Sequence, residues 1–152
     1  MPAEAERWRV FLDTNVFIAG LASQTGASAA LLDLGEAEEI LVVVSPQVLV
    51  ELDRVMESKF PHLVDRCRDF IKNLAPFLTD DPTVAQVREA QGIIDKDDAP
   101  ILAAAKLESV DYLVTLDVKH FHTPKVRAFF PTPILTPAQF LDTFRKFWEQ
   151  AS

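Results

Sequence analysis

Short apolar runs alternate with longer segments of helical pattern along the chain. The runs are rich in β-branched residues and lack a polar residue at every second position, which is typical of strands buried on both faces of a sheet. They cover 8–12, 40–44 and 112–115, with a weaker run at 133–135. Because strands separated by helices pair in parallel through right-handed crossovers, the pattern predicts a three-layer α/β/α sandwich with a central parallel sheet of about four or five strands.

Helices are predicted where apolar residues recur at helical spacing. The predicted segments are 27–38, 46–59, 62–74, 83–92, 98–108 and 137–148. Two of these starts are marked by a capping residue followed by proline at the first helical position, in Ser45-Pro46 and Thr136-Pro137. The chain has 152 residues and no internal repeat, so we expect one domain over 1–152.

Acidic residues stand near the ends of the predicted strands. Asp13 directly follows the first strand and Asp117 comes two residues after the third. Both are therefore expected at the carboxyl edge of the sheet, where parallel α/β domains bind their ligands. Glu51 lies in the helix that starts at this edge after the second strand. It is about one turn from the apolar residues Val48 and Val55, which predicts that its side chain faces inward.

A fourth acid, Asp98, opens the predicted helix before the third strand and shares the apolar face of that helix. Such a helix is expected to start at the opposite edge of the sheet. Asp98 would then reach the other acids only if segment 83–92 supplied a reversal of the chain. Asp97 is the rival for this position, because Asp95, Asp97 and Asp98 stand close together in the sequence.

Each of these acids also has a purely structural explanation. Asp13, Asp98 and Asp117 could cap helices, and Glu51 could be a solvated helix residue. Together, however, four inward-facing carboxylates would repel one another, and burial would raise their pKa values. A divalent cation is the simplest compensation, and hard oxygen ligands favour Mg²⁺ or Mn²⁺. A single ion and a pair of ions roughly 3.5–4 Å apart are both compatible with this set.

The charge balance limits how the protein can bind nucleic acid. A net charge of −8 at pH 7 argues against a surface that is basic throughout, as in passive nucleic-acid binders. The clearest basic segment is 117–127, where Lys119, Lys125 and Arg127 oppose one acid, Asp117. These three cations could bind phosphate groups beside the acids. A solvated loop or helix end explains them equally well.

The cysteine content and the N-terminal pattern favour a reducing compartment. Cys67 is the single cysteine, so the chain forms no internal disulfide and has no zinc-type Cys/His cluster. The apolar runs are far shorter than a transmembrane helix, and the N-terminal segment lacks the pattern of a secretion signal. We therefore expect a cytoplasmic location without a membrane partner.

Four segments of the chain resemble a known family. They are FLDTNVFIAGL, SPQVLVELDRVM, DKDDAPILAAA and DYLVTLDVKHF, and they occur in the order and spacing found in PIN-domain proteins. The resemblance covers about residues 10–137 and is greatest to the VapC-type toxins of bacterial and archaeal toxin–antitoxin systems. It implies a single PIN-like nuclease domain with Mg²⁺- or Mn²⁺-dependent endoribonuclease activity, which hydrolyses RNA phosphodiester bonds.

The resemblance also implies roles for individual residues and partners. The positions that match the catalytic and metal-binding acids of the family are Asp13, Glu51, Asp98 and Asp117. Asn15 and Thr115 match polar residues next to the first and fourth acids, and we expect them to hydrogen-bond the carboxylates. A small inhibitory antitoxin and a homodimer are further implications. The alternative function is a non-catalytic PIN-like interaction module that keeps a metal-binding acidic pocket.

Overall fold

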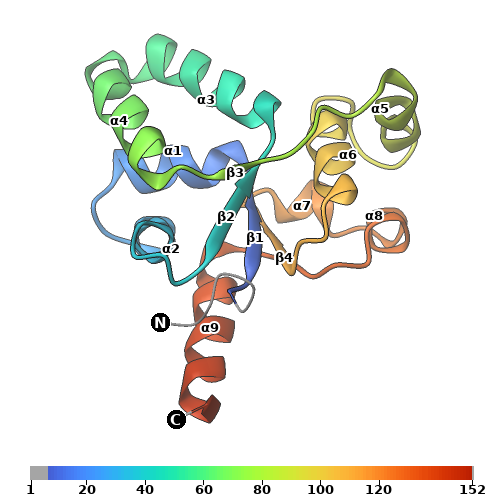
Figure 1. Cartoon of the computed structure of the whole chain (residues 1–152). Helices are drawn as coiled ribbons and strands as arrows, with labels where there is room; N and C mark the ends of the chain where they lie inside the picture. Colours follow the sequence, from blue (N-terminus) through green and yellow to red (C-terminus); the bar gives the residue numbers. More distant parts are fainter. Residues whose placement is uncertain (1–6, 152) are drawn as a thin grey trace.

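The structure of the protein is a computed structural model that describes residues 7–151. Its centre is a parallel sheet with strands β1 (Arg9–Leu12), β2 (Leu41–Val44), β3 (Phe77–Leu78), β4 (Tyr112–Val114) and β5 (Ile134–Leu135). The strands lie in the order β3-β2-β1-β4-β5 (Figure 1). The helices are α1 (Thr14–Ala22), α2 (Ala27–Glu36), α3 (Pro46–Lys59), η2 (Pro61–Leu63), α4 (Val64–Leu74), α5 (Val84–Gln91), α6 (Ala99–Leu107), α7 (Val118–Phe121), α8 (Pro124–Phe129) and α9 (Pro137–Ala151).

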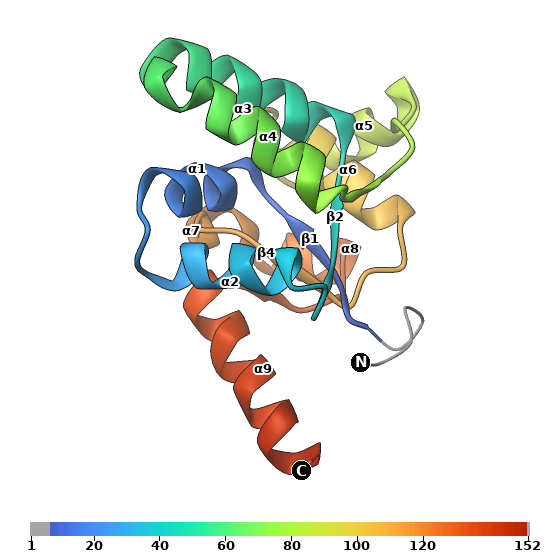
Figure 2. The same ribbon diagram turned by 60° about the vertical axis from the view of Figure 1, so that its left-hand side comes forward.

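Helices cover both faces of the sheet. Figure 1 shows α1, α2, α3 and α4 on one side of the strands and α5, α6, α7 and α8 on the other. In both views α9 extends away from the body of the domain (Figure 2). Parallel strands between two helical layers confirm the predicted α/β/α sandwich, and the sheet has five strands within residues 7–151. The core lies in the middle of this sheet, where Val10, Phe11, Val43 and Leu113 are fully buried.

The central strand, β1, is where the order of the strands reverses. From β1 the chain passes to β2 and β3 on one side and then crosses to β4 and β5 on the other. β1 pairs in parallel with both β2 and β4. Such a reversal leaves a crevice at the carboxyl edge of the sheet, between the loops that follow the two adjacent strands. The residues that follow β1 and β4 therefore border the usual ligand-binding position of this kind of sheet.

The sequence pattern did not reveal the buried helix α1, the short helices α7 and α8, or the strand β3. α1 begins directly after β1, but Val16, Phe17 and Leu21 are all buried, and the helix has almost no polar face that would show a helical period. α7 and α8 are too short to show such a period. β3 is an exposed edge strand of two residues.

The prediction that α6 starts at the opposite edge of the sheet, away from the other acids, is wrong. Asp98, the N-cap of α6, lies beside Asp117, which follows β4, so α6 starts at the carboxyl edge of the sheet. From there α6 leads back to the start of β4 at Tyr112 and runs antiparallel to the strands, as a crossover helix must when it joins parallel strands. No reversal is needed to place Asp98 at this edge, and α5 packs against α6.

Within residues 7–151, no single helix is both long and apolar enough to cross a membrane. α1 and α2 reach the required length and composition only as a pair, and the two helices are bent by 100° relative to each other. Each of them contributes buried residues to the core of the domain.

Candidate metal centre

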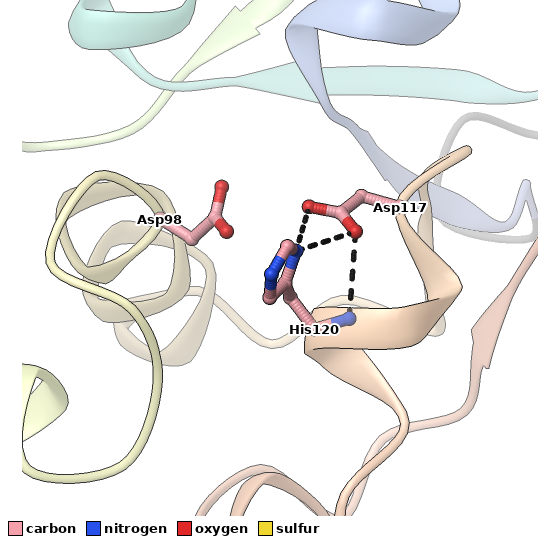
Figure 3. A group of neighbouring side chains, drawn as sticks. All are labelled: Asp98, Asp117 and His120. Carbon is pink, nitrogen blue, oxygen red and sulfur yellow. Dashed lines mark hydrogen bonds and ion pairs between the residues drawn. The ribbon is translucent and has the colours of Figure 1, made fainter.

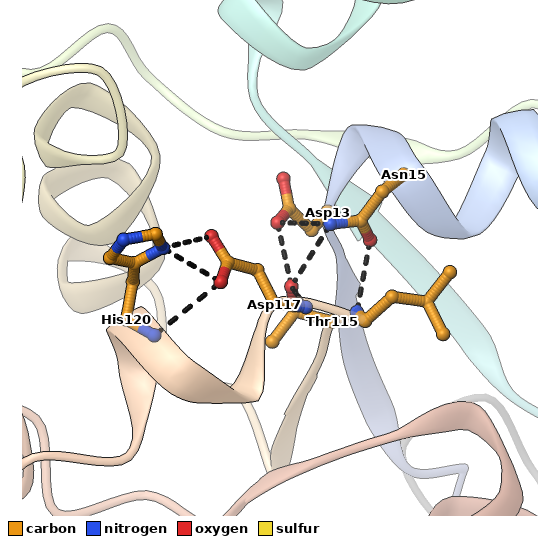
Figure 4. Close-up of polar contacts among 6 residues, drawn as sticks. Asp13, Asn15, Thr115, Asp117 and His120 are labelled. Carbon is orange, nitrogen blue, oxygen red and sulfur yellow. Dashed lines mark hydrogen bonds and ion pairs between the residues drawn. The ribbon is translucent and has the colours of Figure 1, made fainter.

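Asp13 is held firmly at the carboxyl end of β1. It is the N-cap of α1, and its Oδ1 accepts a hydrogen bond from the backbone N–H of Thr14 at 2.8 Å. Its Oδ2 accepts hydrogen bonds from the Thr115 hydroxyl at 2.7 Å and from Asn15 Nδ2 at 3.3 Å (Figure 4). Because only 4% of Asp13 is exposed, these contacts fix its carboxylate at the crevice between β1 and β4.

Thr115 and Asn15 join the ends of the two strands. The buried Thr115 hydroxyl accepts hydrogen bonds from the backbone N–H of Asp117 at 3.0 Å and from Asn15 Nδ2 at 3.3 Å. Asn15 Oδ1 accepts a hydrogen bond from the backbone N–H of Leu116 at 3.0 Å. The hydrogen bonds expected from Asn15 and Thr115 to Asp13 are therefore present, and Thr115 links Asp13 to the loop that carries Asp117.

Thr115→Val keeps the shape of this side chain but removes its hydroxyl. We expect the free energy of unfolding to fall by about 1–3 kcal/mol, because buried groups of Asp13 and Asp117 lose a hydrogen-bond partner. We expect the affinity for Mn²⁺ to fall about 10–100-fold, since Thr115 orients a candidate ligand. Urea unfolding and calorimetric titration measure these effects. Thr115→Ser keeps the hydroxyl and should keep the affinity; equal losses in both variants would mean that the loss of the hydroxyl does not account for the effect.

Asp98, Asp117 and His120 form a compact group beside Asp13. Asp117 is the N-cap of α7, and its two carboxylate oxygens lie 2.8 and 2.9 Å from Nδ1 of His120. Asp98 reaches the group from the start of α6 (Figure 3). One ligand atom from each of these three residues lies within 4.8 Å of the others. Asp117 caps α7 and His120 lies on it, whereas Asp98 comes from the start of α6, so the fold brings Asp98 to this pair.

Glu51 is exposed on α3, so the prediction that it faces inward is wrong. The buried residues of α3 are Val48, Leu52 and Met56. Glu51 precedes Leu52 and is therefore turned by about 100° around the helix from this buried stripe. Loss of hydration near the neighbouring residues is the largest cause of the raised pKa of the Glu51 carboxyl, and the charge of Asp13 raises this pKa further. Glu51 thus remains an electrostatic neighbour of Asp13 even though its side chain is exposed.

The two candidates for the third acid have different surroundings. Asp98 is half-buried and belongs to the group with Asp117 and His120. Asp97 is exposed, and its charge contributes to the raised pKa of Glu51. The structure therefore brings Asp98, and not the exposed Asp97, into the group with Asp117 and His120.

Burial and repulsion raise the pKa values of Asp13, Asp98 and Glu51, as the sequence predicted for these three acids. Burial is the main cause at Asp13, where the hydrogen bond from Thr115 opposes it. At Asp98, burial followed by the charges of Asp117 and Asp13 raises the pKa to about 6. The folded protein therefore favours a proton or another positive charge at these carboxylates.

The donor groups of this centre fit a hard divalent cation. Carboxylate oxygens are the preferred ligands of Mg²⁺ and Mn²⁺, and a bound cation would offset the cost of the buried charge on Asp13. The hydroxyl of Thr14 is buried and makes no hydrogen bond of good geometry within residues 7–151, although it lies near enough to Glu51 to lower the pKa of that carboxyl. A buried hydroxyl of this kind beside the acids fits a centre that binds a polar ligand.

The three predicted phosphate-binding cations are all exposed. Lys119 lies on α7, next to His120 in the chain, and Lys125 and Arg127 lie on α8. Phe121, between them in the sequence, is fully buried and belongs to the core. The cations are accessible to an anionic ligand, and their role stays a prediction.

His120 also belongs to this centre, and the sequence pattern did not predict that it lies beside the acids. Its signal was the spacing Asp117-x-x-His120 at the start of a helix. This spacing places an N-cap side chain next to the residue three positions later, as in a capping box. The short length of α7 hid the helix and therefore the contact.

The acidic centre lies where the strand order of the parallel sheet reverses, and buried hydrogen bonds orient it. These features place the protein among the α/β/α domains that bind ligands at the carboxyl edge of the sheet. The PIN domain family model matches residues 9–119, which extend from β1 into α7. The chain belongs to the PIN domain family.

Several solved structures share this fold. FitAcB from Neisseria gonorrhoeae is 21% identical in sequence, with a TM-score of 0.60. The match covers 84% of this chain and 97% of that chain. The structure of VapBC2 from Rickettsia felis bound to a DNA fragment from its promoter is 23% identical in sequence, with a TM-score of 0.60. The match covers 84% of this chain and 96% of that chain. PAE2754 from Pyrobaculum aerophilum is 15% identical in sequence, with a TM-score of 0.61. The match covers 93% of this chain and 98% of that chain. No curated protein gives a significant match.

Proposed function

We propose that the protein is a Mg²⁺- or Mn²⁺-dependent endoribonuclease and the toxin component of a toxin–antitoxin system. The observation that carries the proposal is the centre around Asp13, in which a buried carboxylate with a raised pKa stands beside Asp98 and Asp117. Membership of the PIN domain family and the resemblance to VapC-type toxins support the same activity.

The proposed ligands of the cation are Asp13, Asp98 and Asp117, with Glu51 acting directly or through water. When bound, the cation would stabilise negative charge on the scissile phosphate and lower the pKa of the attacking water. The chain itself keeps the Asp13 carboxylate in one orientation through Thr115 and Asn15. Glu51 is exposed at the edge of the centre and is suited to orient the attacking water.

The test is cleavage of labelled single-stranded and structured RNA by the purified protein. We expect cleavage with Mn²⁺ or Mg²⁺ and none after addition of EDTA. Cleavage that continues in EDTA would contradict a metal-dependent mechanism. Cation binding by a correctly folded protein that leaves every RNA intact would favour the non-catalytic interaction module.

Lys119, Lys125 and Arg127 are the proposed phosphate-binding residues. With Asp13→Asn as the background to prevent cleavage, we expect Lys125→Ala with Arg127→Ala to weaken RNA binding and to reduce the slope of log affinity against log salt by about 2, one for each lost phosphate contact. Fluorescence anisotropy measures this slope. The matched control is Lys59→Ala with Lys72→Ala, which removes two exposed cations from α3 and α4. Equal effects of both pairs would mean that only net charge matters.

The proposed partners are a small antitoxin and a second copy of the chain, both acting in the cytoplasm. The FitAcB and VapBC2 structures support the proposal of an antitoxin only through their shared fold. On α9, Phe147 and Trp148 are 48% and 41% exposed and offer an apolar surface for such contacts. Light scattering of the purified protein measures its oligomeric state.

A further inference from the structure

His120 approaches the acidic centre from the short helix α7. Its Nδ1 lies 2.8 Å from Oδ1 and 2.9 Å from Oδ2 of Asp117. Figure 3 shows the carboxylates of Asp98 and Asp117 facing each other, with the imidazole ring beside them. An imidazole nitrogen therefore faces the same space as two carboxylates that belong to the proposed metal centre.

The Asp98 carboxylate does not cap α6, although Asp98 is the N-cap residue of that helix. At an N-cap, aspartate usually accepts a hydrogen bond from a backbone N–H in the first turn of the helix. The Asp98 side chain makes no such bond to α6 and lies close to Asp117 despite the repulsion between the two charges. The buried Thr14 hydroxyl lacks a hydrogen bond of good geometry within residues 7–151, although the Glu51 carboxyl lies close to it. Both features point to a ligand that the centre holds.

The spacing of the group suits one cation. Around an octahedral ion with ligand distances of about 2.1 Å, adjacent ligand atoms lie about 3 Å apart and opposite ones about 4.2 Å apart. The separations of 2.8 and 2.9 Å between His120 Nδ1 and the Asp117 oxygens match adjacent positions. The remaining separations in the group are within 4.8 Å, so little side-chain rotation is needed to share an ion.

We propose that His120 is a nitrogen ligand of the cation held by Asp98 and Asp117, and that it makes this site prefer Mn²⁺ over Mg²⁺. The inference rests on the proposed metal centre but not on RNA as the substrate. Mg²⁺ binds through oxygen ligands and water. Carboxylate oxygens also suit Mn²⁺, but as a transition-metal ion it accepts an imidazole nitrogen more readily than Mg²⁺ does. The His120 side chain is 53% exposed, so its Nδ1 can turn from the Asp117 carboxylate to a cation without disturbing the core.

Pulsed electron paramagnetic resonance of bound Mn²⁺ tests this ligand directly, because a coordinated imidazole gives a nitrogen hyperfine coupling. We expect the coupling in the wild-type protein and its loss in His120→Ala with Mn²⁺ still bound. The matched control is His62→Ala, which removes an exposed histidine on η2 and should keep the coupling. A wild-type site without nitrogen coupling, or a coupling that survives in His120→Ala, would overturn the proposal.

Competition between Mn²⁺ and Mg²⁺ in calorimetric titrations tests the preference. We expect His120→Ala to lose about 10–100-fold in Mn²⁺ affinity, with a much smaller loss for Mg²⁺. Equal losses for both ions would contradict the preference. An RNA cleavage assay on the same samples separates the two proposals. Cleavage without nitrogen coupling would reject only the role of His120, whereas nitrogen coupling without cleavage would reject only the ribonuclease.

Discussion

Asp13→Asn is expected to reduce RNA cleavage at least about 100-fold, beyond the loss typical of residues that only orient a metal ligand. The amide has the shape of the carboxylate but cannot supply an anionic oxygen to a cation. Asp13 is also the most buried acid of the centre and is fixed by Thr14, Thr115 and Asn15. Single-turnover cleavage of a labelled RNA with Mg²⁺ or Mn²⁺ measures the effect.

The matched control is Asp69→Asn, which makes the same chemical change at an exposed position of α4 and should leave cleavage unchanged. Because burial raises the pKa of Asp13, the ionised side chain costs stability at neutral pH in the metal-free protein. The relief of this cost should offset the hydrogen bonds from Thr14, Thr115 and Asn15 that the amide weakens, so Asp13→Asn should remain folded in EDTA, as its thermal midpoint will show. Equal cleavage by wild type and Asp13→Asn would reveal a contaminating nuclease and refute the role of Asp13.

The parallel sheet could be predicted because its main strands are unbroken apolar runs. β1, β2 and β4 fall within the runs at 8–12, 40–44 and 112–115. Buried strands of this kind carry their signal in a few consecutive residues. α1 could not be found in this way, since a helix that is apolar on nearly all sides shows no period.

The two acids that follow strands could also be located from the sequence, because the ends of parallel strands meet at one edge. Asp13 and Asp117 lie there, linked through Thr115. The other positions depend on tertiary geometry. The direction of α6 decides where Asp98 lies, and the rotation of α3 about its own axis decides whether Glu51 is buried. Apolar spacing fixes a helical face only to within a neighbouring residue, so the exposure of Glu51 was predicted incorrectly.

Without bound cations, the protein is expected to become less stable as the pH rises from about 4 to about 7. The sign follows from Asp98, whose ordinary pKa of 3.8 is raised to about 6 in the folded protein. The folded state therefore holds this proton more tightly than the unfolded state. The resulting stability is fully present below pH 3.8 and is lost as the pH rises through about 6. The pKa values of Asp13 and Glu51 are raised as well and act in the same direction.

Two exposed acids act in the opposite direction at lower pH. Hydrogen bonds from Arg68 to Asp53 and from Arg145 to Asp142 lower the pKa of each carboxyl from its ordinary value of 3.8. Their contribution to stability is present above pH 3.8 and is lost only as the pH falls further. The decline between about pH 4 and pH 7 should therefore be visible in thermal midpoints measured in EDTA.

Mn²⁺ should reverse this decline, and more strongly at about pH 7.5 than at about pH 5, because cations bind the deprotonated carboxylates. At about 100 times the dissociation constant, binding stabilises the folded state by about 2.7 kcal/mol. For a domain of this size that raises the thermal midpoint by about 5–10 °C. Asp98→Asn should flatten the pH dependence in EDTA and reduce the shift with Mn²⁺, whereas Asp69→Asn should change neither. An unchanged pH slope in Asp98→Asn would show that Asp98 is not the group that couples stability to pH.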